Sequence, residues 1–480
     1  MTRLVLYVLA MILLPQSSSF ALQKEQTLTV KRFGRVVVYR NEPEPKNMIL
    51  FVSGDGGWNS GTAKMARSLV DLDTTVVGID IRTLLKSMES GDLTCTYPAA
   101  DFEHLSQSIQ KTLKFRAYHR PILVGYSAGA TMVYGLMGQA PRGTFLGAIS
   151  LGYCREIETN RRWCTGGGLT SRKSADGKSL TFSTSRSLTE PWYILQGRKD
   201  LVCRFDQASA VLKSNLQARL VSLPTVGHDF SNQRAWLPDF KRSFNAIIRS
   251  KITTQALPAR AGALVTESND KRHAADVSKL PLIEVPVSRG QSDTLALLIT
   301  GDGGWAGLDR AVSAGLASNG VPVVGFDSLS YFWNRRTPAE TESAVERTLR
   351  HYVSIWGKQR IILIGYSFGA DVLPFVISRL PKDLKNKLRL VTIISPSQDA
   401  EFEFHVADWA GLSLGETYPT LPEFRKSPGT KVLCLYGISE TESLCPKLGK
   451  LGKKSIGLPG GHDVGGDFQR LVREILSASR

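Results

Sequence analysis

The sequence is poor in the residues that build metal centres. It has seven histidines and six cysteines among 480 residues, with no C-x-x-C motif and no close pair of histidines. It therefore predicts neither a metal site nor a cofactor. Beyond the N-terminus, no apolar run is long enough to cross a bilayer. Acidic residues are also few, since 43 Asp and Glu oppose 60 Lys and Arg, a formal charge of +17. No DNA- or RNA-binding motif accompanies that charge, so a nucleic-acid partner is not expected.

The one long apolar run lies at the N-terminus. Arg3 precedes an apolar stretch over residues 4–14, and Ser19-Phe20-Ala21 follows as a small-x-small cleavage site. This order predicts a secretory signal peptide over residues 1–21 and an exported protein. An N-terminal membrane anchor is the alternative, although the apolar core is short for one. No cysteine follows the run, so lipid attachment is not expected there.

Export changes the meaning of the charge and of the cysteines. An anionic membrane surface becomes the natural counterpart of a basic protein, and a basic surface without a partner is the alternative. Disulfides are permitted, and free buried thiols are the other interpretation. Cys434 with Cys445 is the only pairing within the second half, whereas four cysteines in the first half allow three connectivities. Those four are Cys95, Cys154, Cys164 and Cys203.

One pattern of motifs occurs twice. GYSAG (125–129) and GYSFG (365–369) each follow an apolar run, with GDGGW upstream and GHD downstream. The two GDGGW aspartates are 247 residues apart, the two elbow serines 240 and the two GHD histidines 234. Anchors in the same order predict two homologous domains whose loops differ in length. A third G-x-S-x-G match around Ser413 lacks both a preceding strand and partner motifs, and is set aside.

Short apolar runs alternate with helical patterns in both halves, which predicts parallel sheets. We expect two tandem α/β-hydrolase domains, each a mostly parallel sheet flanked by helices. The first spans residues 22–250 and begins with two edge strands. The second spans residues 281–480, and the polar residues 251–280 form the linker.

Each half holds the residues of a serine-hydrolase triad. A serine hydroxyl needs a histidine to take its proton and an acid to orient that histidine. In this fold the chain order is serine, acid, histidine. The first half offers Ser127, Asp200 and His228 in that order. The second offers Ser367 and His462 with either Glu440 or Glu442 between them.

Two ways of counting give different acids in the second half. Counting from the glycine that ends the preceding strand matches Asp200 to Glu440. Counting back from Cys203 and Cys445 matches Asp200 to Glu442. Both glutamates remain candidates, and we slightly prefer Glu442.

An acyl-transfer oxyanion needs backbone donors in fixed positions. The residue after each nucleophile, Ala128 or Phe368, supplies one N–H. The GDGGW loop is expected to supply the second. Its candidate glycines are Gly56, Gly57, Gly303 and Gly304.

Three carboxylates mark the surroundings of these sites. Asp55 and Asp302 must point away from a developing oxyanion, fix the loop, or meet a cationic part of the substrate. Asp371, one turn after Ser367, either adds negative charge to the site or stabilises the N-terminus of the helix that follows Ser367. Residues 398–426 hold six acids and two bases, whereas residues 155–190 hold seven bases and four acids. A cationic acyl group should therefore prefer the second site.

With these motifs in view, GYSAGATMVYG, GYSFGADVLPF and the two GDGGW loops resemble the AcvB/VirJ family of bacterial virulence proteins. The whole chain is similar to the two-domain AcvB form, and the second half to the single-domain VirJ form. The resemblance implies a periplasmic α/β-hydrolase that removes lysine from lysyl-phosphatidylglycerol, with a link to virulence. It also implies Ser367 as nucleophile and His462 as its base.

The partners implied are an anionic phospholipid at the membrane surface, aminoacyl-phosphatidylglycerol, and components of a type IV secretion system. Two other functions compete with the lipid hydrolase. One is a general periplasmic esterase for small substrates. The other is a non-catalytic accessory or binding protein for secreted cargo, with inherited but idle triads.

Overall fold

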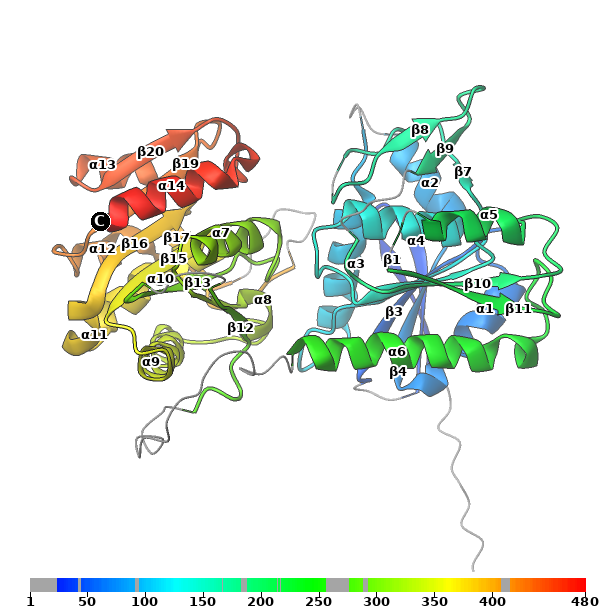
Figure 1. Cartoon of the computed structure of the whole chain (residues 1–480), viewed down its shortest axis with the longest axis horizontal. Helices are drawn as coiled ribbons and strands as arrows, with labels where there is room; N and C mark the ends of the chain where they lie inside the picture. Colours follow the sequence, from blue (N-terminus) through cyan, green and yellow to red (C-terminus); the bar gives the residue numbers. More distant parts are fainter. Residues whose placement is uncertain are drawn as a thin grey trace, which may run out of the picture.

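The computed structural model describes residues 24–41, 45–90, 95–165, 167–182, 188–213, 215, 217–255, 276–287, 292–406 and 415–480. The expected signal peptide, most of the expected linker and Ser413 lie outside these residues. Two domains lie side by side (Figure 1). The last helix of the first domain, α6, runs from Leu237 to Gln255, so the boundary expected at residue 250 falls inside a helix.

The first domain is built on an eight-stranded sheet in the order β1-β2-β4-β3-β5-β6-β10-β11. The strands are β1 (Lys24–Val30), β2 (Gly34–Arg40), β3 (Asn47–Val52), β4 (Thr74–Ile79), β5 (Ile122–Tyr126), β6 (Gly147–Leu151), β10 (Trp192–Gly197) and β11 (Ala218–Leu223). All neighbours from β4 to β11 pair in parallel, whereas β1–β2 and β2–β4 are antiparallel. The two edges of the sheet are β1 and β11. Of the two N-terminal strands expected at an edge, only β1 lies there, because β2 pairs with β1 on one side and β4 on the other, and that expectation is corrected.

Helices cover both faces of this sheet because neighbouring side chains of a strand point to opposite faces. On β3, Leu50 belongs to the apolar cluster that includes α2, α3 and α4, whereas Phe51 belongs to the cluster that includes α1 and α6. The helices are α1 (Ser60–Arg67), α2 (Ile81–Glu89), α3 (Pro98–Thr112), α4 (Ala128–Gln139) and α5 (Phe205–Ala210), besides α6.

The second domain repeats the plan with seven strands in the order β12-β14-β13-β15-β16-β19-β20, of which only the β12–β14 pair is antiparallel. The strands are β12 (Leu282–Val285), β13 (Thr294–Ile299), β14 (Val323–Phe326), β15 (Arg360–Tyr366), β16 (Leu388–Ile394), β19 (Val432–Gly437) and β20 (Lys454–Leu458). The helices are α7 (Gly307–Ser318), α8 (Ser328–Tyr331), α9 (Pro338–Ile355), α10 (Phe368–Arg379), α11 (Lys382–Lys387), α12 (Thr420–Arg425), α13 (Cys445–Lys450) and α14 (Phe468–Ser479). Helices α9 and α10 pack on one face, α7 and α14 on the other. The expected two tandem α/β-hydrolase domains are confirmed.

Two small antiparallel sheets were not anticipated. One joins β7 (Glu156–Glu158), β8 (Ser171–Lys173) and β9 (Ser179–Phe182) in the order β7-β9-β8, and the other pairs β17 (Asp399–Ala400) with β18 (Tyr418–Pro419). Both lie in the charged segments that differ between the halves. The disulfides join Cys95 to Cys164, Cys154 to Cys203 and Cys434 to Cys445. The pairing in the second half is the expected one.

The domains meet through the end of α3 and the segment after α8. The indole N–H of Trp333, a side chain that is 1% exposed, donates to the Phe115 carbonyl (2.7 Å). Lys111 Nζ donates to the Trp333 carbonyl (2.5 Å) and lies 4.8 Å from the centre of the indole ring. Asn334 donates to the Arg116 carbonyl (2.9 Å). A buried, hydrogen-bonded tryptophan therefore joins the two domains.

Candidate active sites

Each candidate nucleophile lies on a sharp turn between a strand and a helix. Ser127 joins β5 to α4 with φ 55°, and Ser367 joins β15 to α10 with φ 51°. A positive φ is strained for serine and is maintained here by the surrounding packing. The flanking glycines are needed for space, since a Cβ on Gly125 would lie 2.0 Å from the carbonyl oxygen of Gly129. The G-x-S-x-G pattern is thus explained by close backbone contact.

The first site brings together the three residues predicted for it. His228 Nε2 lies 3.0 Å from Ser127 Oγ, and His228 Nδ1 lies 2.9 Å from Asp200 Oδ2. The Asp200 carboxylate is fully buried and also accepts the backbone N–H of Cys203 (2.8 Å). These bonds hold the acid in position while it orients the imidazole.

The second site has the same arrangement with Glu440 as the acid. His462 Nε2 lies 2.8 Å from Ser367 Oγ, and His462 Nδ1 lies 2.6 Å from Glu440 Oε1. The other oxygen of Glu440 accepts the N–H of Gly437 at the end of β19 (3.0 Å). Glu442 lies two residues further along and is exposed.

The preference for Glu442 is therefore corrected. Counting from cysteines failed because Cys203 is bonded to Cys154, whereas Cys445 is bonded to Cys434. The two cysteines occupy different places in the two domains and are not equivalent. Counting from the strand-end glycine succeeded, since each acid sits three residues after the end of its strand.

The predicted oxyanion donors are only partly retained. Ala128 and Phe368 are the first residues of α4 and α10, where a backbone N–H has no acceptor within the helix. Gly57 and Gly304, however, donate to the carbonyls of Gly54 (2.9 Å) and Gly301 (3.1 Å) inside their own turns. These two glycines are removed from the set of donors. Gly56 and Gly303 remain in it.

Gly57 and Gly304 serve the turn itself. Their φ angles are 69° and 71°, and a Cβ on Gly57 would lie 2.7 Å from a carboxylate oxygen of Asp80. The same carboxylate oxygen accepts the N–H of Trp58 (2.7 Å). Asp327 lies equally close to Gly304. Asp80 and Asp327 therefore position the GDGGW loops. The sequence signal for them was their separation of 247 residues, which equals the separation of Asp55 and Asp302.

Asp55 does not point away from its nucleophile. Its Oδ2 lies 3.3 Å from Ser127 Oγ and is a second acceptor, besides His228 Nε2, for the single hydroxyl hydrogen of Ser127. Ser127 is itself only 4% exposed. A carboxylate this close to the reacting serine opposes an oxyanion and attracts a cation. Of the three roles considered for Asp55, turning away is thus excluded in the first site.

Acidic side chains gather beside the second nucleophile. Asp371 is 8% exposed, and its Oδ1 accepts the N–H of Ser397 (2.6 Å). Burial first, and the charges of Asp302 and Asp399 to a smaller extent, raise the pKa of Asp371 to about 8, although its hydrogen bonds with Ser397 lower it. Glu103 lies on α3 of the first domain. Its burial first, and the nearby charge of Asp302 second, raise the pKa of Glu103 to about 7.

The tyrosine of each G-Y-S motif was missed as a site residue. Tyr126 donates its hydroxyl to the carbonyl of His228 (2.9 Å), and its ring lies 5.6 Å from the imidazole. The rings of Tyr366 and His462 are also 5.6 Å apart. Burial raises the pKa of Tyr126 to about 12, so the hydroxyl stays protonated as a donor. The repetition of tyrosine before both serines was the available signal.

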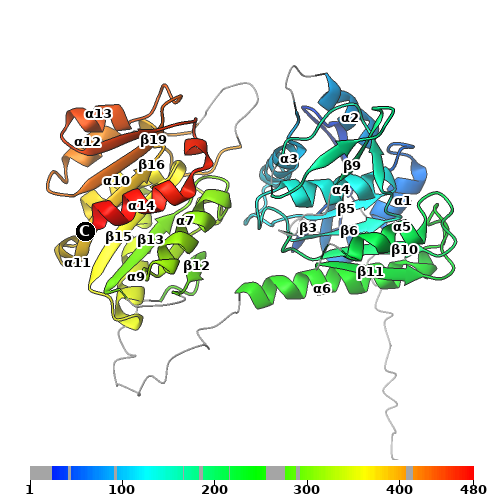
Figure 2. The same cartoon turned by 45° about the horizontal axis from the view of Figure 1, so that its top comes forward.

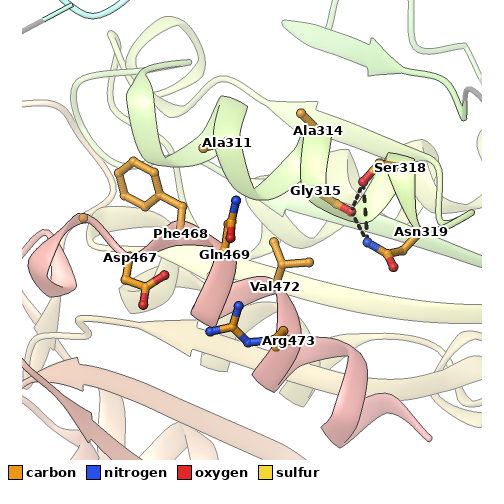
Figure 3. Close-up of a pocket in the computed structure, with 11 residues that line it drawn as sticks. Ala311, Ala314, Gly315, Ser318, Asn319, Asp467, Phe468, Gln469, Val472 and Arg473 are labelled. Carbon is orange, nitrogen blue, oxygen red and sulfur yellow. Dashed lines mark hydrogen bonds between the residues drawn. The ribbon is translucent and has the colours of Figure 1, made fainter.

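A groove of about 830 Å³ lies between α7 and α14, as Figure 3 shows. Its lining residues are Ala311, Ala314, Gly315, Ser318, Asn319, Gly466, Asp467, Phe468, Gln469, Val472 and Arg473. No member of either triad lines it, so it is not the acyl site. Within the described ranges, no cluster of His, Cys, Asp and Glu is suited to a metal ion. None of the helices there combines the length and apolar character that a membrane span requires.

A comparison with models of known protein families finds a match over two regions of the chain. The model of the family described as bacterial virulence protein (VirJ) matches residues 46–142 and 293–480, more than half of the chain. These ranges contain both GDGGW loops and both elbow serines. No curated protein matches the sequence.

Among solved structures, the chain is similar to the esterase domain of a Rhodothermus marinus protein, with a TM-score of 0.32 and 14% identity over 47% of this chain and 98% of that one. A Xanthomonas campestris α/β serine hydrolase without a lid has a TM-score of 0.31 and 20% identity over 48% and 94%. An α/β hydrolase from a Medee basin deep-sea metagenome library has a TM-score of 0.33 and 11% identity over 48% and 100%.

Proposed function

The chain belongs to the VirJ family of bacterial virulence proteins, and we propose that it is a serine hydrolase cleaving the aminoacyl ester of lysyl-phosphatidylglycerol. The proposal is carried by the contact between serine, histidine and acid, at 3.0 and 2.9 Å in the first domain and 2.8 and 2.6 Å in the second. A serine in such a contact becomes a nucleophile because the imidazole accepts its proton. We assign the main activity to Ser367.

The reaction proceeds in two steps. His462 Nε2 takes the proton of Ser367 as Oγ bonds to the ester carbonyl carbon, and Glu440 stabilises the resulting imidazolium. The Phe368 N–H stabilises the oxyanion. The imidazolium then gives its proton to the departing glycerol oxygen of phosphatidylglycerol, which leaves lysine bound to Ser367 as an ester. Water, deprotonated by His462, attacks that ester, and the imidazolium returns the proton to Ser367 Oγ as the bond to the lysyl carbonyl breaks, which releases lysine and the free serine.

The charge distribution supports a lysyl group at the second site. Lysine bound through its carboxyl group carries two ammonium groups, and Asp302 and Asp399 supply negative charge near that site. Asp371 and Glu103, whose pKa values are raised to about 8 and 7, would lose their protons when an ammonium group comes near. The other half of the substrate is an anionic phospholipid, and the net charge of +17 favours its approach. Export by the signal peptide predicted over residues 1–21 would bring the protein to this lipid in the periplasm.

The test is release of free lysine from vesicles that contain lysyl-phosphatidylglycerol. The mature protein is compared with Ser367→Ala, Ser127→Ala and the double variant. Ser413→Ala is the matched control, since Ser413 lies in the third G-x-S-x-G match, which has no histidine and acid motifs around it. We expect loss on Ser367→Ala and none on Ser413→Ala. Loss only in the double variant would mean two working sites.

Absence of lysine release by a folded wild-type protein would overturn the lipid hydrolase. Release of alcohol from small soluble esters would then favour the general esterase. If neither substrate is cleaved, the accessory role remains, and an unchanged phenotype of the double serine variant in bacteria would support it.

A further inference from the structure

The first site is bordered by a loop that exposes aliphatic side chains. This loop, residues 198–204, connects β10 to α5 and is called the 198–204 loop below. Leu201 is 90% exposed and Val202 68%, the highest values among the large hydrophobic side chains of the described residues. Single exposed aliphatic residues are ordinary, but an adjacent pair at this exposure gains nothing from the fold of its own domain. It indicates a partner that removes these side chains from water.

The 198–204 loop is held rigidly. The carboxylate of Asp200 accepts the backbone N–H groups of Val202 (3.0 Å) and Cys203 (2.8 Å). Cys203 is bonded to Cys154, and its carbonyl accepts a hydrogen bond from Gln196. The tip of the loop is therefore fixed before any partner arrives, which lowers the entropic cost of association. Because Asp200 also orients His228, the exposed tip is attached directly to the catalytic triad.

Positive charge flanks the aliphatic pair. Arg198, Lys199 and Arg204 are exposed. Arg204 pairs with Asp206 (3.1 Å), so the net charge comes from Arg198 and Lys199. The guanidinium of Arg198 is fixed by the Phe205 ring, 3.7 Å away, and by the Ser222 hydroxyl (2.8 Å). Arg155, next to the Cys154 that is bonded to Cys203, is exposed as well.

The other domain does not cover this surface. Helix α5, which begins three residues after Val202, lies on the side of the first domain away from the second (Figures 1 and 2). Aliphatic side chains surrounded by Arg and Lys complement an anionic bilayer, whose interface accepts apolar groups and whose phosphates attract cations.

We propose that the 198–204 loop docks the protein on an anionic lipid bilayer. Leu201 and Val202 enter the interface, and Arg198 and Lys199 contact lipid phosphates. The first active site then faces the lipid surface. The choice of an anionic bilayer rests on the proposed function, whereas the docking itself is measured without hydrolysis.

The experiment is sedimentation of the mature full-length protein with vesicles of phosphatidylglycerol and phosphatidylcholine, or of phosphatidylcholine alone. The variants are Leu201→Ser with Val202→Ser, and Arg198→Gln with Lys199→Gln. Ile355→Ser is the matched control, since Ile355 is also exposed (50%) but ends α9, at the opposite end of the strands in the second domain. The variant that loses both aliphatic side chains should bind anionic vesicles at least about tenfold more weakly than the wild type. The Gln variants should bind anionic vesicles more weakly, and their binding should depend less on salt.

A second measurement follows insertion directly. Leu201→Trp should shift its fluorescence to the blue on adding anionic vesicles, whereas Ile355→Trp should not. Unchanged binding of the Leu201 and Val202 double variant, or equal loss in Ile355→Ser, would refute docking through this loop. Equal binding to neutral vesicles would refute the role of Arg198 and Lys199. Lysine release from detergent micelles does not require docking on a bilayer. Failure of the proposed hydrolysis would therefore appear in the micelle assay, and failure of docking would appear in sedimentation.

Discussion

Replacing Glu440 by glutamine separates the triad acid of the second site from its neighbour. The substitution keeps the size of the side chain and removes the negative charge 2.6 Å from His462 Nδ1. Glu442→Gln makes the same chemical change two residues away, on an exposed turn. Both variants are made in Ser127→Ala, so that only the second site turns over.

The size of the effect follows from the environment of the pair. Loss of the acid in a fully buried triad lowers kcat by about 10⁴-fold, because the histidine takes the wrong tautomer and its imidazolium loses a stabilising charge. The side chain of Glu440 is 14% exposed and that of His462 52%. Water screens part of the charge there, so a loss on the order of 10²- to 10³-fold is expected. Glu442→Gln should stay within about twofold of its parent.

Lysine release from lysyl-phosphatidylglycerol in detergent micelles gives kcat, and thermal unfolding checks that each variant is folded. A loss in Glu442→Gln as large as in Glu440→Gln would refute the assignment. So would a Glu440→Gln enzyme that is folded and retains most of its activity.

Three more predictions use the same chain. Burial raises the pKa of Asp371 to about 8, so the folded state holds a proton that the unfolded chain has lost above about pH 4, and stability falls as pH rises towards 8. Asp371→Asn should reduce that fall by on the order of 2–4 kcal/mol between pH 5 and 8 in urea unfolding, and an unchanged slope would contradict it. Asp55→Asn in Ser367→Ala should weaken turnover of cationic aminoacyl esters and speed that of neutral esters, each by about tenfold; equal effects on both esters would argue against a cation contact. Trp333→Ala should destabilise the full-length protein by about 3–5 kcal/mol in denaturant unfolding, because it empties a buried site between the domains; a change under about 1 kcal/mol would mean that the interface adds little.

The order of motifs predicted most of the fold because each anchor has a local cause. The glycines beside Ser127 are required by backbone contacts. Trp58 of GDGGW packs against Gly78, where a Cβ would lie 2.1 Å from its ring, and Trp305 packs against Gly325 in the same way. Such contacts within one βαβ unit leave a repeated signature in the sequence.

Features that depend on pairing across the chain could not be predicted in this way. The acid of the second triad was misjudged because disulfide partners are invisible in a sequence with several cysteines. The direction of Asp55 depends on how its loop approaches Ser127, which no spacing reveals. Glu103 reaches the surroundings of Asp302 only because α3 docks on the second domain.

The two sites differ in ways that suit different halves of the proposed lipid substrate. In the first, the acid is fully buried, the nucleophile is 4% exposed, and the bordering loop is aliphatic and basic. In the second, the histidine is 52% exposed and the neighbouring carboxyl groups are acidic partners for ammonium groups. A basic, aliphatic border fits a phospholipid headgroup and bilayer, whereas clustered carboxyl groups fit a lysyl ester. If the first domain holds the protein on the membrane, the second works at a high local concentration of substrate, and removing the 198–204 loop's aliphatic side chains should raise KM on vesicles while leaving kcat in micelles unchanged.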